Sequence, residues 1–322
     1  MQRRNLGRSG LAVSIVGLGC NNFGGRLDRE GSIEVVHAAL DLGITLFDTA
    51  DMYPRGSRGA SEEILGEALG ARRKDIVLAT KFGMAMDDAG TLQGASRRYI
   101  LSSVEGSLRR LKTDWIDLYQ VHQPDPLTPI EESVRALDDL VRQGKVRYVG
   151  CSNFTGWQAV DALWTAKHLG LNGFIACQNQ YSLLARDIER ELFPALAAHG
   201  LGLLPFYPLA SGLLSGKYKR NAAPPAGTRL AQSKPLQERF FTDANLATVE
   251  KLAAFCAKRG RTLLELAFSW LLARPCVASV IAGATSPRQL ELNVKAPAWE
   301  LTPDDLAEID RLTVPPQPLS IG

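Results

Sequence analysis

The sequence contains no long apolar run and no excess of one charge. Its most apolar stretch, Cys276–Ala284, is far shorter than the roughly 20 residues that cross a bilayer, so we expect no membrane-spanning helix. The 37 Lys and Arg residues nearly balance 34 Asp and Glu, a net charge of +3. Aromatic residues do not interleave with basic runs, which argues against nucleic-acid binding. The N-terminal Met1–Gly10 is polar and basic without an apolar core, so it is not expected to be a secretory signal.

Disulfide and metal-binding patterns are also lacking. The five cysteines are odd in number, widely spread and form no CxxC pair, which argues against a disulfide framework and a zinc ribbon. The four histidines, which share no ligand spacing, are His37, His122, His168 and His199. We therefore predict no metal ion, buried inert thiols and a location in the reducing cytoplasm.

Eight short apolar runs alternate with longer segments of helical spacing. The expected strands are Ser14–Gly19, Thr45–Asp48, Ile76–Lys81, Ile116–His122, Val146–Cys151, Phe174–Gln178, Gly202–Phe206 and Val277–Ala282. Solid apolar strands, each followed by a helix, predict a parallel sheet covered on both faces. Eight such units fit a closed (β/α)₈ TIM barrel better than an open doubly wound sheet. Ser32 is expected to cap the helix after the first strand.

Several segments add to this repeating pattern. Met1–Ala12 is expected to form a β-hairpin that plugs the bottom of the barrel, and extra helices are expected at Thr262–Ala273 and Pro303–Leu312. A long βα loop at about 215–244 follows the seventh strand, and we interpret it as functional. No linker precedes it, so we predict one barrel domain over residues 1–322 rather than two domains.

Polar residues lie where neighbouring strands end. The second strand ends in Asp48, the third in Lys81 and the fourth in His122, while Tyr53 lies in the loop after the second strand. In a (β/α)₈ barrel the active site lies at these strand ends. Each residue alone is compatible with an ion pair, a cap or a half-buried aromatic. The coincidence on three successive strands favours a catalytic site.

The four side chains form a sensible set for proton transfer. A tyrosine hydroxyl titrates near 10 and needs help to act as an acid or base at neutral pH. An ammonium about 4 Å away interacts by roughly 4 kcal/mol at an effective dielectric of 20, so we expect Lys81 to lower the pKa of Tyr53. Asp48 would keep Lys81 charged while offsetting part of that effect. His122 would donate to a substrate carbonyl, with its tautomer fixed by Gln123–Asp125.

Two glycine patterns resemble nucleotide-binding motifs without completing them. Gly17-Leu18-Gly19 is followed by Asn22, so the Rossmann fingerprint GxGxxG is incomplete. Gly212–Lys217 (GLLSGK) has one residue too few between its glycines for a P-loop, and Tyr218 replaces the magnesium-binding Ser or Thr. A small-residue loop that ends in Lys217 still suits a pyrophosphate.

Seven ordered segments carry a family resemblance. They are Leu46–Leu69 (LFDTADMYPRGSRGASEEILGEAL), Leu78–Gly83 (LATKFG), Asp117–Asp125 (DLYQVHQPD), Val146–Phe154 (VRYVGCSNF), Gln178–Leu184 (QNQYSLL), Pro205–Tyr218 (PFYPLASGLLSGKY) and Ile281–Val294 (IAGATSPRQLELNV). From about Asn5 to Leu312 the chain resembles the aldo-keto reductases, in the branch that includes bacterial members and the β-subunits of voltage-gated potassium channels. The resemblance implies the same barrel and a nicotinamide cofactor bound without a Rossmann fold.

The resemblance also implies roles for individual residues. Tyr53 would be the proton donor in carbonyl reduction, Lys81 and Asp48 would lower its pKa, and His122 would orient the carbonyl. The nicotinamide would be held by Ser152, Asn153, Gln178 and Tyr207, and the pyrophosphate by Pro208, Leu209, Ser211, Gly212, Leu214 and Lys217.

NADP(H) is the cofactor we expect. A helix N-terminus at Ser286 and Pro287, with Arg288 and Gln289, suits the 2′-phosphate. The other residues assigned to this end of the cofactor are Arg229, which by resemblance to the channel β-subunits reaches the same phosphate, with Gly283, Thr285 and Asn293. Two residues depart from the family pattern: Gly283 replaces a common Lys and Leu292 a common Glu.

The sequence therefore predicts an NADP(H)-dependent oxidoreductase that reduces small aldehydes or ketones reversibly. A cofactor-binding sensor or regulatory subunit with slow turnover is the alternative, and a barrel aldolase or isomerase with Lys81 as Schiff base is a third. Asn21, Phe23 and Met52 are expected to wall the pocket, and Val314–Gly322 to make few substrate contacts. The physiological substrate and the oligomeric state are not predicted.

Overall fold

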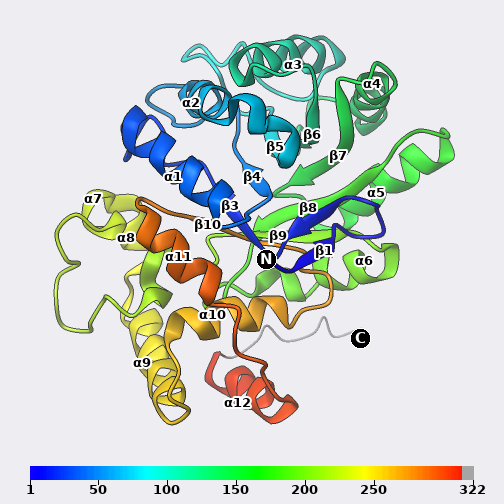
Figure 1. Cartoon of the computed structure of the whole chain (residues 1–322). Helices are drawn as coiled ribbons and strands as arrows, with labels where there is room; N and C mark the ends of the chain where they lie inside the picture. The colour runs from blue at the N-terminus through cyan, green and yellow to red at the C-terminus, as the bar shows by residue number, and fades with distance from the viewer. Residues whose placement is uncertain (314–322) are drawn as a thin grey trace.

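Parallel strands form a ring at the centre of the molecule (Figure 1). The computed structural model describes residues 1–313, so the expectation for Val314–Gly322 lies outside the described residues. Within them the eight barrel strands are β3 (Val16–Gly19), β4 (Leu46–Asp48), β5 (Val77–Phe82), β6 (Ile116–Val121), β7 (Val146–Ser152), β8 (Phe174–Gln180), β9 (Gly202–Phe206) and β10 (Val280–Gly283).

The order of pairing closes the ring. Strands that are consecutive from β3 to β9 pair in parallel, and β10 pairs with β3. The last gap is bridged in parallel between Leu203 of β9 and Val277, just before β10. The Leu203 amide donates to the Cys276 carbonyl at 2.7 Å. The predicted (β/α)₈ barrel is confirmed.

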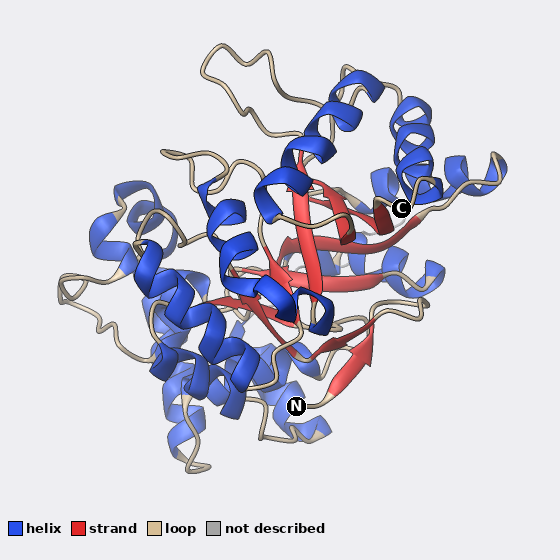
Figure 2. Cartoon of the chain, turned by 45° about the horizontal axis from the view of Figure 1, so that its top comes forward, coloured by secondary structure: helices blue, strands red, loops and turns tan. Residues whose placement is uncertain are grey.

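Helices follow the strands and cover the outside of the barrel, as the blue ribbons around red strands in Figure 2 show. The helices after β3 to β8 are α1 (Arg29–Asp41), α2 (Ala60–Leu69), α3 (Arg97–Leu111), α4 (Ile130–Arg142), α5 (Gly156–His168) and α6 (Leu192–His199), with short 3₁₀ turns η1 (Gly70–Asp75) and η2 (Asp187–Glu189). After β9 come η3 (Ala210–Ser215), α7 (Arg229–Gln232), α8 (Lys234–Phe240), α9 (Asp243–Ala257) and α10 (Leu263–Leu272), and after β10 come α11 (Pro287–Lys295) and α12 (Pro303–Thr313). The extra helices predicted near α10 and α12 are present.

The N-terminal hairpin closes one end of the barrel. It consists of β1 (Arg3–Asn5) and β2 (Ala12–Ser14), paired antiparallel. Leu6 and Val13 are fully buried and pack in one cluster with inward-facing strand residues such as Leu118. Gly7 has φ +60°, and a Cβ there would lie 2.7 Å from the backbone of both Gly200 and Gly202. Only glycine fits this close approach, and the predicted plug is confirmed.

Two expectations are corrected. The segment at 215–244 is not one long loop, because α7 and α8 lie within it and the irregular part covers only 216–228. Pro235 is compatible with α8 because it occupies the first turn, where its missing N–H has no helical partner. Helix α1 is capped by Asp28, whose Oδ1 accepts from the Gly31 amide at 2.9 Å. Ser32 lies inside the helix and donates to the Asp28 carbonyl.

Candidate active site

Asp48 and Lys81 form a buried ion pair at the strand ends opposite the hairpin. Lys81 Nζ lies 2.7 Å from Asp48 Oδ2 and donates to the Thr49 carbonyl at 2.8 Å. The Lys81 side chain is fully buried and that of Asp48 nearly so. Burial lowers the pKa of Lys81, but Asp48, Tyr53 and Cys20 together outweigh it and the net pKa is raised. Lys81 is therefore a fixed cation, as expected from the sequence.

Tyr53 lies over this pair. Lys81 Nζ is 5.1 Å from the centroid of the Tyr53 ring, and the His122 ring stands nearly perpendicular to Tyr53 at 5.6 Å. The backbone of the loop is fixed, since the Tyr53 amide donates to Ala50 and its carbonyl accepts from Ser61. The structure thus brings the four predicted side chains together.

Lys81 lowers the pKa of Tyr53, as predicted, but the net shift has the opposite direction. Burial raises the pKa of the phenol above its ordinary value, and the Lys81 ammonium opposes this without reversing it, while Asp48 adds to the rise. Removal of water destabilises the phenolate more than the Lys81 ammonium, whose charge Asp48 partly neutralises, stabilises it. Tyr53 is consequently a protonated phenol at neutral pH.

His122 is a buried neutral imidazole. Burial lowers its pKa well below the usual range, and the charges of Lys81 and Arg55 lower it further. Its Nδ1 has no hydrogen-bond partner among the described residues. The expectation that Gln123–Asp125 fixes the tautomer is not met, because the Asp125 carboxylate accepts instead from the Ala95 and Leu127 amides and from Thr128.

Ser152, Asn153 and Gln178 adjoin this group at the ends of β7 and β8. Asn153 has φ +61° and donates from Nδ2 to the His122 carbonyl at 2.9 Å and to Ser152 Oγ at 3.1 Å. Gln178 Nε2 donates to Asp48 Oδ1 at 2.8 Å. The amide donor of Gln178 is therefore already bound to Asp48, which leaves its carbonyl oxygen for a ligand.

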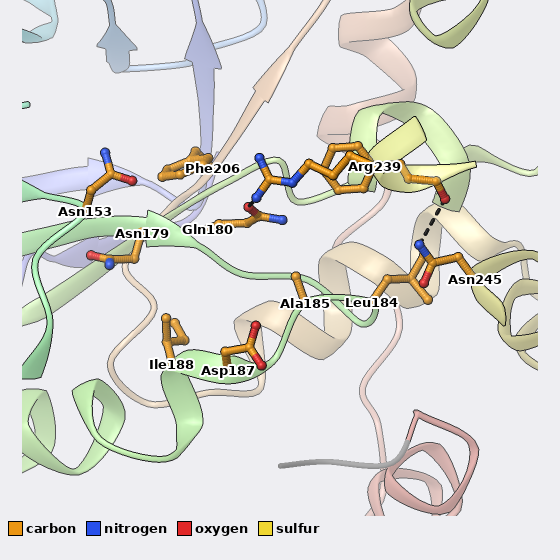
Figure 3. Close-up of a pocket in the computed structure, with 11 residues that line it drawn as sticks. Asn153, Asn179, Gln180, Leu184, Ala185, Asp187, Ile188, Phe206, Arg239 and Asn245 are labelled. Atoms are coloured by element: carbon orange, nitrogen blue, oxygen red, sulfur yellow. Dashed lines mark hydrogen bonds between the residues drawn. The ribbon is translucent and has the colours of Figure 1, made fainter. Parts of the chain in front are cut away.

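Asn153 also lines a cavity of about 420 Å³ beside the strand ends. Figure 3 shows Asn153, Asn179 and Gln180 along one side, with Arg239 of α8 next to Gln180. The Arg239 guanidinium donates to Gln180 Oε1. Tyr53 is not among the residues that line this cavity.

The turn after β9 has an unusual backbone. Tyr207, Ala210, Ser211 and Gly212 all have positive φ, at 51°, 45°, 58° and 94°. Ser211 Oγ is buried without a partner among residues 1–313. A Cβ on Gly212 would lie 3.2 Å from Lys217 Nζ, so the glycine makes room for that cation. Turns of this type gather backbone N–H groups that bind anions.

Sequence reasoning missed Arg26. It extends from the loop after β3 and donates from Nε to Gln232 Oε1 at 2.9 Å and from Nη2 to the Gly227 carbonyl at 3.3 Å. Burial lowers the pKa of Arg26, and the charge of Arg229 lowers it further. Burial likewise lowers the pKa of Lys217, and the charge of Arg26 adds to that shift. In the described part of the chain none of these three cations forms an ion pair. The one local feature of the sequence that could have drawn attention to Arg26 is its position directly after Gly24 and Gly25.

The last group of predicted residues lies at the end of β10. Gly283 ends the strand, and Ser286 caps α11 by accepting from the Gln289 amide. Gln289 Oε1 accepts from the Thr285 amide at 2.9 Å. Asn293 is buried on α11 and Arg288 is exposed.

A family model described as Aldo/keto reductase family matches residues 15–314. The chain belongs to the aldo/keto reductase family. This aldo/keto reductase is 39% identical over 306 residues to a "Probable voltage-gated potassium channel subunit beta" of Oryza sativa subsp. japonica, covering 92% of this chain and 91% of that protein. It is 39% identical over 304 residues to an "Uncharacterized oxidoreductase YrpG" of Bacillus subtilis (92% and 91% covered). It is 32% identical over 341 residues to a "Versiconal hemiacetal acetate reductase" of Aspergillus parasiticus (98% of each).

As a member of this family, the chain is an oxidoreductase. The residues present fit a phosphate-bearing cofactor. Within residues 1–313 the buried Ser211 hydroxyl has no hydrogen-bond partner, and Arg26, Lys217 and Arg229 form no ion pair with an acidic side chain. Among residues 1–313 no helix is long and apolar enough to cross a membrane. No group of three or more His, Cys, Asp or Glu side chains in that range is placed to hold a metal ion.

Proposed function

We propose that this chain reduces the carbonyl group of small aldehydes or ketones to the alcohol, reversibly, with NADP(H). The observation that carries the proposal is the Lys81–Asp48 ion pair next to Tyr53, with Lys81 Nζ 5.1 Å and the His122 ring 5.6 Å from the centroid of the Tyr53 ring. This set holds one transferable proton next to one permanent cation and one neutral donor. That is what reduction of a carbonyl requires from the protein.

A nicotinamide cofactor, when bound, would supply the hydride. Tyr53 donates its hydroxyl proton to the carbonyl oxygen as negative charge develops there. The phenolate left on Tyr53 is stabilised by the Lys81 ammonium, which Asp48 keeps charged and fixed in place. His122 is neutral, so one ring nitrogen carries a hydrogen that can bind the carbonyl oxygen and orient it.

The raised pKa of Tyr53 is consistent with this role. A general acid must be protonated before the reaction, and burial ensures that. The Lys81 cation acts on the ionised form, so it lowers the energy of the transition state more than that of the resting phenol.

The cofactor residues are part of the same proposal. Ser152, Asn153 and the carbonyl oxygen of Gln178 would bind the carboxamide, and Tyr207 would stack on the nicotinamide ring. The remaining assigned residues would follow the cofactor toward its adenine end: Pro208, Leu209, Ser211, Gly212, Leu214, Lys217, Arg229, Gly283, Thr285, Ser286, Gln289 and Asn293. The reducing cytoplasm is the proposed compartment, because the Cys151 and Cys177 sulfur atoms lie 3.3 Å apart as free thiols.

Steady-state loss of NADPH absorbance with methylglyoxal, nitrobenzaldehyde and glyceraldehyde tests the proposal. We expect turnover that depends on substrate with at least one of them. Tight cofactor binding, with NADPH oxidation no faster than without substrate for every compound, would instead support the sensor alternative. The similarity to channel β-subunits is the reason to test that alternative. A Schiff-base role for Lys81 is disfavoured by its raised pKa and full burial, and borohydride trapping should leave Lys81 unlabelled.

A further inference from the structure

Asp51 is a fully buried acid two residues before Tyr53. Its amide donates to the Lys81 carbonyl at 3.0 Å, which fastens the start of the Tyr53 loop to β5. Its Oδ2 accepts from Ser103 Oγ of α3 at 3.2 Å, and its Oδ1 has no partner among the described residues. The Met52 amide also acts on this carboxylate and lowers its pKa. A buried carboxylate that is held by one hydroxyl and one backbone amide, and by no cation of its own among the described residues, is poorly stabilised.

The surrounding groups supply little positive charge. Glu62 of α2 is also fully buried, and its oxygens accept from Arg110 Nε at 2.7 Å and from Thr80 Oγ1 at 2.6 Å. Arg110 of α3, the cation that faces this cluster, is thus bound to Glu62 and not to Asp51. Among the described residues the guanidinium nearest these two buried acids therefore neutralises Glu62 directly and Asp51 only through space.

The remaining titratable groups of the cluster are phenols. Burial raises the pKa values of Tyr99 on α3 and Tyr119 on β6, and the Asp51 charge raises them further. Neither phenol therefore offers charge compensation. Burial and then the Glu62 charge raise the pKa of Asp51 to about 8, although Arg110, Ser103 and the Met52 amide lower it.

We propose that Asp51 is a positioning residue whose protonated carboxyl holds the Tyr53 loop in its working geometry, so that loss of this proton at alkaline pH switches the site off. An ionised Asp51 would be repelled by the Glu62 carboxylate, and both side chains are fully buried. Movement of the segment between Ala50 and Tyr53 relieves this repulsion and displaces the phenol from Lys81 and His122.

Carbonyl reduction against pH tests the activity side of this inference, which rests on the proposed function. In the wild type we expect kcat to fall as pH rises through about 8, the region of the Asp51 pKa. The Tyr53 pKa is raised above its ordinary value and that of His122 is lowered, so both titrate outside this window. Asp51→Asn, which imitates the neutral acid, should retain most of the neutral-pH rate and lose the fall near pH 8. Asp51→Ala should be slow at every pH.

Ser103→Ala provides a directional test that a merely structural role of Asp51 would not meet. The Ser103 hydrogen bond lowers the Asp51 pKa, so its removal should move the alkaline midpoint to higher pH. The exposed Asp161→Asn on α5 is the matched control and should keep the wild-type profile.

Thermal unfolding tests the inference independently of any reaction. Between the ordinary pKa of Asp and about 8, the folded chain binds a proton that the unfolded chain has released, so wild-type stability declines as pH rises across that range. The Tm of Asp51→Asn minus that of the wild type should therefore grow from pH 6 to pH 8.5, by at least about 3 °C, and then level off. A constant difference in Tm, or an unchanged alkaline limb in Asp51→Asn, overturns the inference. A growing difference in Tm without any reductase activity would instead contradict only the proposed function.

Discussion

Lys81 Nζ and Asp48 Oδ2 lie 2.7 Å apart, with both side chains almost completely excluded from solvent. Asp48 Oδ1 also accepts from Gln178 at 2.8 Å and Gln120 at 3.4 Å, so the pair is the centre of a polar network that joins β4, β5, β6 and β8. A charge buried in this way is stabilised mainly by its partner.

This relationship predicts strong coupling in a double-mutant cycle. Asp48→Asn and Lys81→Met should each lower the free energy of unfolding by about 3–5 kcal/mol, because each leaves the other charge buried and unpaired. The double variant should cost much less than the sum, as measured by urea unfolding. The exposed pair Lys234–Glu238, 3.9 Å apart, is the control and should show no measurable coupling. Additive effects at Asp48 and Lys81 would contradict the predicted dependence of each charge on the other.

Tyr53→Phe should abolish carbonyl reduction and leave NADPH affinity nearly unchanged. The variant removes the proton donor while keeping the ring that packs on His122. Loss of a general acid typically slows a reaction by about 10²–10⁴-fold. Stopped-flow absorbance measures the rate, and quenching of tryptophan fluorescence measures the affinity. Near wild-type turnover in this variant would eliminate Tyr53 as the donor.

The sequence predicts the parts of the site that depend on strand ends. Asp48, Lys81 and His122 follow consecutive apolar strands, and a parallel barrel brings all such ends to one mouth. Their convergence therefore follows from periodicity alone. The seven-segment resemblance agrees with it and adds the role of Tyr53 as proton donor and the residues expected to bind the cofactor.

Contacts between distant loops, and the effect of burial on a pKa, cannot be predicted from local sequence patterns. Arg26 meets Gly227 across 201 residues of sequence, and no local pattern encodes that approach. The net pKa of Tyr53 depends on how much water the folded chain excludes, which sequence spacing does not give. The start of α1 is harder to choose from the sequence, because Asp28 and Ser32 are both good capping residues. In the structure Asp28 is the cap, and α1 is one turn longer than a helix capped by Ser32 would be.

His122 should make stability sensitive to acid. Its pKa is depressed in the folded state by burial and by Lys81 and Arg55. At pH values below about 6.5, the ordinary pKa of histidine, the unfolded chain binds a proton at this position and the folded chain does not. The free energy of unfolding therefore decreases as the pH is lowered. His122→Gln should remove about 2 kcal/mol of the loss between pH 6.5 and 5. Urea unfolding at both pH values measures this, and the exposed His168→Gln is the control. An identical acid dependence in His122→Gln and the wild type would show that His122 is not the group responsible.

Cofactor preference provides the last test, with NADPH expected to bind more tightly than NADH. The 2′-phosphate needs cationic donors, and Arg229 and Arg288 are the assigned candidates. Each Arg–phosphate contact should contribute roughly 1–3 kcal/mol, or about 5–150-fold in affinity. The double variant Arg229→Ala plus Arg288→Ala should therefore weaken NADPH binding and leave NADH binding nearly unchanged.

Arg26→Gln is the informative comparison, because Arg26 approaches the same loop through Gly227 and Gln232. If Arg26 faces the pyrophosphate, which both cofactors share, its loss weakens both to the same extent. Titration of tryptophan fluorescence with each cofactor gives the dissociation constants. Equal constants in the wild type, or an undiminished preference in the double variant, would reject the assignment of these two arginines.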